Sequence, residues 1–135
     1  MSSLFRVSRR CHDGLVFLGL LAERYGSGAF LTVPQAASSS LSGAGYLEQI
    51  VGPLREAGIV EARRGPGGGY RLTRDPRTIT IGEIVRLLEG PTALVECQAR
   101  EGCPQKRGCG SRKMWNTLQG RINETLGTMT LAEIA

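Results

Sequence analysis

Several residue types and patterns that mark common classes of protein are scarce or missing in this chain of 135 residues. It contains four cysteines, fewer than a secreted domain of this length usually carries when disulfides hold it together. It has one histidine, no nucleophile–histidine–acid set and no acid–base pair. The glycines at residues 65–69 are not followed by the lysine and the serine or threonine of a phosphate-binding loop. We therefore expect neither a secreted disulfide scaffold nor an enzyme, and no small-molecule substrate.

The N-terminal apolar run at residues 15–22 is too short to span a bilayer. It follows three arginines and so superficially matches a signal peptide, but His12 and Asp13 stand just before it. Charged residues follow at positions 23–24, without an Ala-x-Ala cleavage pattern. We therefore expect a buried first helix, a cytoplasmic protein and no membrane partner.

The overall composition is that of a globular protein with some affinity for polyanions. Hydrophobic residues make up 41% of the chain, and the mean hydropathy is −0.11. The length suits one domain, or one domain with an appendage, that buries a substantial core. A net charge of +5 and an isoelectric point near 9.4 favour partners such as nucleic acid or acidic membranes. A charge of this size is weak evidence by itself.

The first 78 residues have the pattern of a small helical domain with a hairpin. Ser8 or Asp13 could cap the first helix, and Thr32 and Pro34 suit the start of the second, after a short extended segment. Hydrophobic spacing and glycine stops predict three helices and then two strands, at residues 8–25, 36–40, 42–58, 59–63 and 69–73. This order predicts a winged helix-turn-helix.

The third predicted helix contains an interior proline, Pro53. Proline costs about 3 kcal/mol inside a plain helix, so we expect a kink or a compensating contact there. The inner face of this helix is formed by apolar residues at helical spacing, namely Leu47, Ile50, Val51 and Leu54.

Residues 79–135 are expected to form a second functional part. Thr80 caps a predicted amphipathic helix at residues 81–89, with Ile81, Ile84, Val85 and Leu88 facing inward. A long helix is predicted from about residue 111, before a short terminal turn. Its apolar stripe consists of Met114, Trp115, Leu118, Ile122 and Leu126. The stripe could be ordinary core, but a complete winged domain leaves little core to cover, so we expect a dimer contact. The predicted fold class is mainly α with a small β-hairpin.

In a helix-turn-helix the second helix enters the major groove of DNA. This rule places Gly45, Tyr46, Glu48 and Gln49 near base edges. Glutamine can bond adenine, and glutamate can accept from cytosine N4. At the hairpin tip, the residues expected at phosphates or in the minor groove are Arg63, Arg64, Gly67 and Gly68. The alternative is a winged helix that is used only for protein contacts.

Three cysteines lie close together, Cys97, Cys103 and Cys109, with the spacing C-x5-C-x5-C. Thiolates at such spacing suit an iron–sulfur cluster or zinc, and the absence of a C-x2-C pair weakens zinc. Three cysteines leave one ligand position open. Reduced thiols without a metal, or a thiol redox switch, remain the alternatives.

With these features the chain resembles the IscR/NsrR/RirA-type iron–sulfur transcriptional regulators over nearly its whole length. The matching segments are residues 5–8, 46–49, 53–60, 64–70, 81–85, 88–91 and 130–134, together with the cysteine loop and the Trp115 helix. The resemblance implies a homodimeric regulator, here a repressor, whose binding to promoter DNA depends on a cluster that senses redox state, nitric oxide or iron status. It assigns major-groove contacts to Glu48 and Gln49, and a wing contact to Arg64.

The same resemblance implies that Cys97, Cys103 and Cys109 hold the cluster. IscR-like members have a histidine three residues after the last cysteine, where this chain has Arg112, which offers no lone pair. NsrR-like members use an acidic residue of the partner's first helix, at the position of His12. His12 from the partner subunit is thus the expected fourth ligand, ahead of its neighbours Cys11 and Asp13.

Mixed cysteine and histidine ligation favours a 2Fe-2S cluster over 4Fe-4S.

A second departure from the family concerns the helix-turn-helix, because residues 41–45 differ from the family's usual turn and Gly45 offers no side chain to the groove. The alternative function is a cluster-free regulator of the same fold that responds through a thiol switch, zinc or a small ligand.

Overall fold

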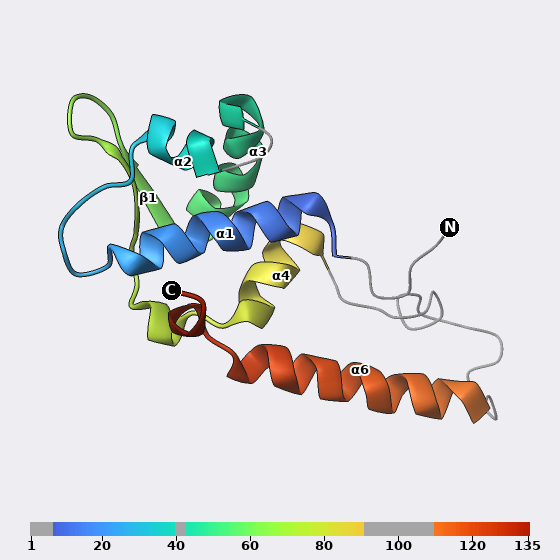
Figure 1. Cartoon of the computed structure of the whole chain (residues 1–135). Helices are drawn as coiled ribbons and strands as arrows, with labels where there is room; N and C mark the ends of the chain where they lie inside the picture. Colours follow the sequence, from blue (N-terminus) through green and yellow to red (C-terminus); the bar gives the residue numbers. More distant parts are fainter. Residues whose placement is uncertain (1–6, 40–42, 91–109) are drawn as a thin grey trace.

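Helix α1 (Arg9–Glu23) runs through the middle of the molecule and contacts α2, α3, α4 and β2 (Figure 1). The computed structural model describes residues 7–39, 43–90 and 110–135. Ser8 caps α1, because its Oγ accepts a hydrogen bond from the Cys11 N–H at 3.1 Å. Phe17, Leu18 and Leu21 are buried along the helix. The predicted buried first helix is confirmed, although it ends at Glu23, two residues earlier than expected.

Helices α2 (Val33–Ser39) and α3 (Gly43–Glu56) follow, and they pack against each other. Helix α2 begins at Val33, directly after Thr32 as the sequence suggests, so it is longer at its start than the predicted range of residues 36–40. The reason is a capping box, in which Thr32 Oγ1 accepts from the Gln35 N–H at 3.3 Å and Gln35 Oε1 accepts from the Thr32 N–H at 3.0 Å. The predicted inner face of α3 is confirmed, since Leu47, Ile50, Val51 and Leu54 are all buried.

Strands β1 (Val60–Arg63) and β2 (Gly69–Leu72) form the predicted antiparallel hairpin, with Val60 opposite Leu72 and Arg63 opposite Gly69. Leu31 adds a single bridge to the outer side of β2, through two backbone hydrogen bonds of 2.8 Å with Tyr70. Gly69 permits this approach: it has φ +144°, and a Cβ there would lie 2.1 Å from the Leu31 carbonyl oxygen. The hairpin is thereby attached to the segment that leads into α2.

Helix α4 (Ile81–Glu89) follows a short 3₁₀ turn (Pro76–Thr78) and is capped by Thr80 as predicted, since the Glu83 N–H donates to Thr80 Oγ1 at 3.1 Å. A second 3₁₀ turn (Leu131–Glu133) returns to the start of α4. There Thr80 bridges Thr130, and the Leu131 N–H donates to the Ile79 carbonyl at 3.0 Å. Leu131 and Ile79 are completely buried in the same core as α1 and α3.

Helix α6 (Gly110–Thr128) differs from the other helices because none of its residues is buried. It contacts α4 and otherwise extends away from the body of the protein (Figure 1). Val85, predicted to face inward on α4, is only partly buried. No helix in the described part of the chain combines the length and apolar character needed to cross a membrane.

Candidate nucleic-acid interface and ligand residues

A groove of about 610 Å³ separates α3 from the hairpin. It brings together residues from three elements that are distant in the sequence. The lining residues are Thr32, Pro34, Glu48, Arg55, Ala62, Arg63, Arg64, Gly65, Gly67, Gly68, Gly69 and Tyr70. The predicted reading helix and the predicted wing therefore share one face of the molecule.

The outward face of α3 follows from the burial of its inner face. Leu47 and Ile50 are buried, and the two residues between them, Glu48 and Gln49, are exposed. Tyr46 is half-buried against the core, and Gly45 lies in the first turn of the helix. Of the four residues predicted to read bases, Glu48 and Gln49 have the most accessible side chains.

The wing is a tight turn in which the Gly68 N–H donates to the Gly65 carbonyl at 3.0 Å. Arg63, Arg64 and Gly67 are exposed, whereas Gly68 is buried against the backbone of Arg63. A Cβ on Gly68 would lie 2.2 Å from the Arg63 carbonyl oxygen. Gly68 thus shapes the turn that carries the arginines, and Gly67 is the glycine on its outer side.

The sequence does not predict that the ring of Phe30 packs against two arginines of the hairpin, Arg63 and Arg71. The guanidinium of Arg71 lies 4.6 Å from the centre of the Phe30 ring, and that of Arg63 lies 6.0 Å from it. Both distances are within the range of cation–π attraction. Arg71 is also paired with Glu61 across the hairpin. The contact joins three separate segments, so no local pattern in the sequence indicates it.

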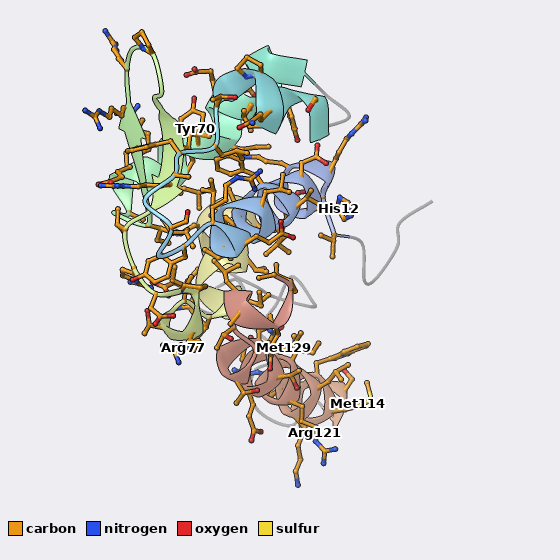
Figure 2. All side chains as sticks on the ribbon, turned by 60° about the vertical axis from the view of Figure 1, so that its left-hand side comes forward. His12, Tyr70, Arg77, Met114, Arg121 and Met129 are labelled. Carbon is orange, nitrogen blue, oxygen red and sulfur yellow. The ribbon has the colours of Figure 1, made fainter. Side chains whose placement is uncertain are left out.

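Tyr70 lies between the hairpin and the helix-turn-helix, with its ring edge against Phe17 at a centroid distance of 5.6 Å (Figure 2). Burial raises the pKa of Tyr70 above its usual value, and the charge of Glu48 raises it further, while Arg55 partly offsets both. The hydroxyl is therefore protonated at neutral pH and faces the groove as a neutral group.

The three residues considered for a fourth ligand have different surroundings. The side chain of His12 is 69% exposed, and Figure 2 shows it at the end of α1 that lies away from the hairpin. Asp13 is buried, and its Oδ1 lies 3.6 Å from His12 Nδ1. Cys11 is completely buried, and burial and the charge of Glu89 raise its pKa to about 11. Only His12 presents a ligand atom to the surface.

Cys97, Cys103 and Cys109 lie outside the described residues. Within the described ranges, no three His, Cys, Asp or Glu side chains form a group that could hold a metal ion. The chain enters the cysteine segment from the end of α4, which is tied to the start of α1 because the Ser8 N–H donates to Glu89 Oε1 at 3.0 Å. The turn that carries His12 is therefore fixed to the entrance of that segment.

Comparison with known proteins identifies the family. The family model for Rrf2, described as an iron-dependent transcriptional regulator, matches residues 7–135. The chain belongs to the Rrf2 family. CymR of Bacillus subtilis (strain 168), an HTH-type transcriptional regulator, is 38% identical over 130 residues, which are 96% of this chain and 89% of CymR. IscR of Yersinia pseudotuberculosis (strain IP 31758) is 34% identical over 134 residues, 99% of this chain and 73% of IscR.

The solved structure of CymR, described as the global cysteine regulator of B. subtilis, matches with a TM-score of 0.80 and 31% identity. It covers 97% of this chain and 98% of CymR. These matches confirm the predicted fold class and the resemblance to the family of IscR-type transcriptional regulators, and they confirm that the protein is not an enzyme. It is a DNA-binding transcriptional regulator of the Rrf2 family.

Proposed function

We propose that this Rrf2 regulator is a homodimeric, cytoplasmic repressor whose binding to promoter DNA is controlled by an iron–sulfur cluster. The observation that carries the proposal is the pairing of two features. Three cysteines at regular spacing lack a histidine after the last of them, and the single histidine of the chain is exposed on α1. The description of the family as iron-dependent supports the same conclusion.

The proposed ligand set consists of Cys97, Cys103 and Cys109 of one subunit and His12 of the other. Three thiolates and one imidazole favour a 2Fe-2S cluster, which would supply a centre that reacts with oxidants or nitric oxide. Asp13 Oδ1 lies 3.6 Å from His12 Nδ1, and we propose the other ring nitrogen, Nε2, as the ligand atom. The cluster part of the protein is assigned to residues 79–135 and the DNA-binding part to residues 1–78.

For the DNA contacts we propose that α3 enters the major groove. Glu48 and Gln49 would read base edges, with Gly45 and Tyr46 at the start of the helix close to the duplex. Arg63 and Arg64 would contact phosphates or the minor groove, because the exposed Gly67 lets the wing approach closely and Gly68 shapes the turn that carries the arginines. The groove between α3 and the wing supports this assignment, because it presents both elements on one face.

The test is anaerobic purification followed by a visible absorption spectrum, iron and sulfide analysis, and DNA-affinity measurements on sequences selected from a random library. We expect a coloured protein, and we expect Cys103→Ala to lose the colour and to change the affinity for selected DNA by at least about tenfold. Cys11→Ala is the matched control, because Cys11 is buried and should leave the spectrum unchanged.

His12→Ala should retain part of the iron but shift the absorption bands, because one ligand is exchanged. A colourless protein whose DNA binding is the same in wild type and Cys103→Ala would overturn the cluster proposal. A cubane signature in Mössbauer spectra would replace 2Fe-2S by 4Fe-4S.

The second candidate is a cluster-free regulator that uses a thiol switch or zinc. It is favoured by the similarity to CymR, whose structure is described as that of a cysteine regulator. This candidate predicts a colourless protein whose DNA affinity responds to a thiol oxidant or to zinc and loses that response in Cys103→Ala.

A further inference from the structure

The interior proline of α3 leaves one backbone carbonyl without its usual partner. In an α-helix the N–H of residue 53 donates to the carbonyl of residue 49, and Pro53 has no N–H. The helix nevertheless continues through Pro53, since the Ala57 N–H donates to the Pro53 carbonyl at 3.1 Å. The acceptor that is left over belongs to Gln49, one of the two exposed residues proposed to read bases.

A side chain from α1 supplies the missing donor. Arg10 Nη2 donates to the Gln49 carbonyl at a long distance of 3.4 Å. The Arg10 side chain is half-buried and its Nε is buried, while the hydrogen bond from Nη2 lies at the exposed edge of the contact between the two helices. This contact is the compensation that the sequence predicts for Pro53.

We propose that Arg10 is a positioning residue that holds the DNA-reading turn of α3 to the first turn of α1 by replacing the N–H that Pro53 lacks. The proposal rests on the assignment of α3 as the reading helix. A charged donor on a backbone carbonyl fixes the path of the helix at Gln49 without using the side chain that faces the DNA. Gln49 and Glu48 are thereby held in one orientation before DNA arrives.

Arg10 also lies between the proposed DNA-reading helix α3 and the turn of α1 that carries the proposed cluster ligand His12. Arg10 lies two residues before His12, and the same turn of α1 is tied to the end of α4 by Ser8 and Glu89. A displacement of this turn, whatever its source, moves the donor that holds Gln49. Arg10 therefore links the end of α4, through the first turn of α1, to the reading helix, in addition to the direct packing of α3 on α4.

A double-mutant cycle between Arg10 and Pro53 tests the proposal on the full-length protein. Arg10→Met removes the donor but keeps an apolar stem of similar length, which preserves packing. Pro53→Ala restores the backbone N–H at position 53, so the helix satisfies the Gln49 carbonyl by itself. Arg9→Met is the matched control, because Arg9 is the exposed neighbour of Arg10 and its loss changes the net charge equally.

Affinity for selected DNA and for unrelated DNA is measured at several salt concentrations, and unfolding is followed in urea. We expect Arg10→Met to weaken specific binding about tenfold with an unchanged salt slope, and to weaken it less than about threefold in the Pro53→Ala background. Pro53→Ala alone should raise the urea midpoint. Arg9→Met should leave the ratio of specific to unrelated affinity unchanged.

Two outcomes would overturn the proposal. An equal loss in both backgrounds would mean that Arg10 does not act through the carbonyl of Gln49. A salt slope that falls by about one would make Arg10 a phosphate contact instead. The assignment of α3 as the reading helix is tested separately with Glu48→Ala and Gln49→Ala. If these variants keep the sequence preference while the effects of Arg10→Met and Pro53→Ala on the urea midpoint remain non-additive, the Arg10 contact stands and the assignment of α3 fails.

Discussion

At the scale of single residues, the side of the helix on which a residue lies decides whether its side chain is available as a ligand, as three consecutive residues of α1 show. Cys11 and Asp13 are buried and His12 is exposed, although all three were candidates for the same ligand position. The sequence predicts the helix and its apolar face, but a candidate at the edge of that face can point either way. The packing of α1 against α4 and α3 settles the orientation.

The buried thiol of Cys11 makes stability depend on pH in the alkaline range. Its pKa is raised from 9.0 to about 11 in the folded protein. Between these values the unfolded chain loses the thiol proton and the folded protein keeps it, so the free energy of unfolding falls as pH rises. The contribution is fully present below pH 9, and about 2 kcal/mol of it is lost by about pH 10.5.

Urea unfolding of metal-free, reduced protein at pH 8 and pH 10.5 measures this effect. Cys11→Ala should be less stable than wild type at pH 8, because the substitution leaves a small cavity, and the difference should shrink at pH 10.5. The other ionisable groups are common to both proteins, so they cancel. Equal differences at the two pH values would show that the Cys11 thiol is not protected from ionisation.

At the scale of elements, local signals predict the helices and the hairpin well, and contacts between segments are the part they miss. The caps at Ser8 and Thr80 and the inner face of α3 follow from residues a few positions apart. The bridge between Leu31 and Tyr70 and the contact of the Phe30 ring with the hairpin arginines join positions that only the folded chain brings together. The sequence therefore predicts the wing as a hairpin but not its attachment to the helices.

Gly69→Ala should break that attachment. The new Cβ would meet three backbone atoms of residues 31–32, which cannot move away as a side chain can. We expect a loss of about 2–3 kcal/mol in the free energy of unfolding, from this clash together with the strain of φ +144°. Chemical denaturation measures the loss, and hydrogen exchange at the Leu31 and Tyr70 amides reports the bridge.

Gly67→Ala is the control within the same turn. Gly67 has φ +76° but no atom within 4 Å of a Cβ placed there, so only the conformational cost of about 1–2 kcal/mol applies. Equal losses in the two variants would mean that the approach of Leu31 to β2 is less close than the geometry indicates.

At the scale of the whole molecule, α6 carries an apolar stripe that is not buried within the described part of the chain. Met114 is 54% exposed, and Trp115, Leu118 and Ile122 are only half-buried. Amphipathic spacing predicts this stripe, but a single sequence contains no information about the surface that covers it. A second copy of the chain is the partner expected from the proposed function.

Leu118→Glu should therefore shift the protein from dimer to monomer and weaken binding to a two-fold symmetric DNA site. A charge in the centre of an apolar interface remains unpaired on both subunits. Sedimentation velocity measures the oligomeric state. Thr117→Glu adds the same charge on an exposed part of the helix away from the stripe and should leave the dimer intact. A Leu118→Glu variant that remains dimeric would move the interface away from α6.

The backbone bridge between Thr80 and Thr130 has a mechanical consequence for α6. It attaches the C-terminal end of α6 to the body of the protein. The helix is about 28 Å long, so a small change of its angle at this attachment moves its N-terminal end by a larger distance. A tilt of about 10° at this attachment would displace the far end by about 5 Å. If the α6 helices of two subunits form the dimer contact, the angle between these helices sets the separation of the two α3 helices. That separation must match the roughly 34 Å between successive major grooves on one side of the duplex.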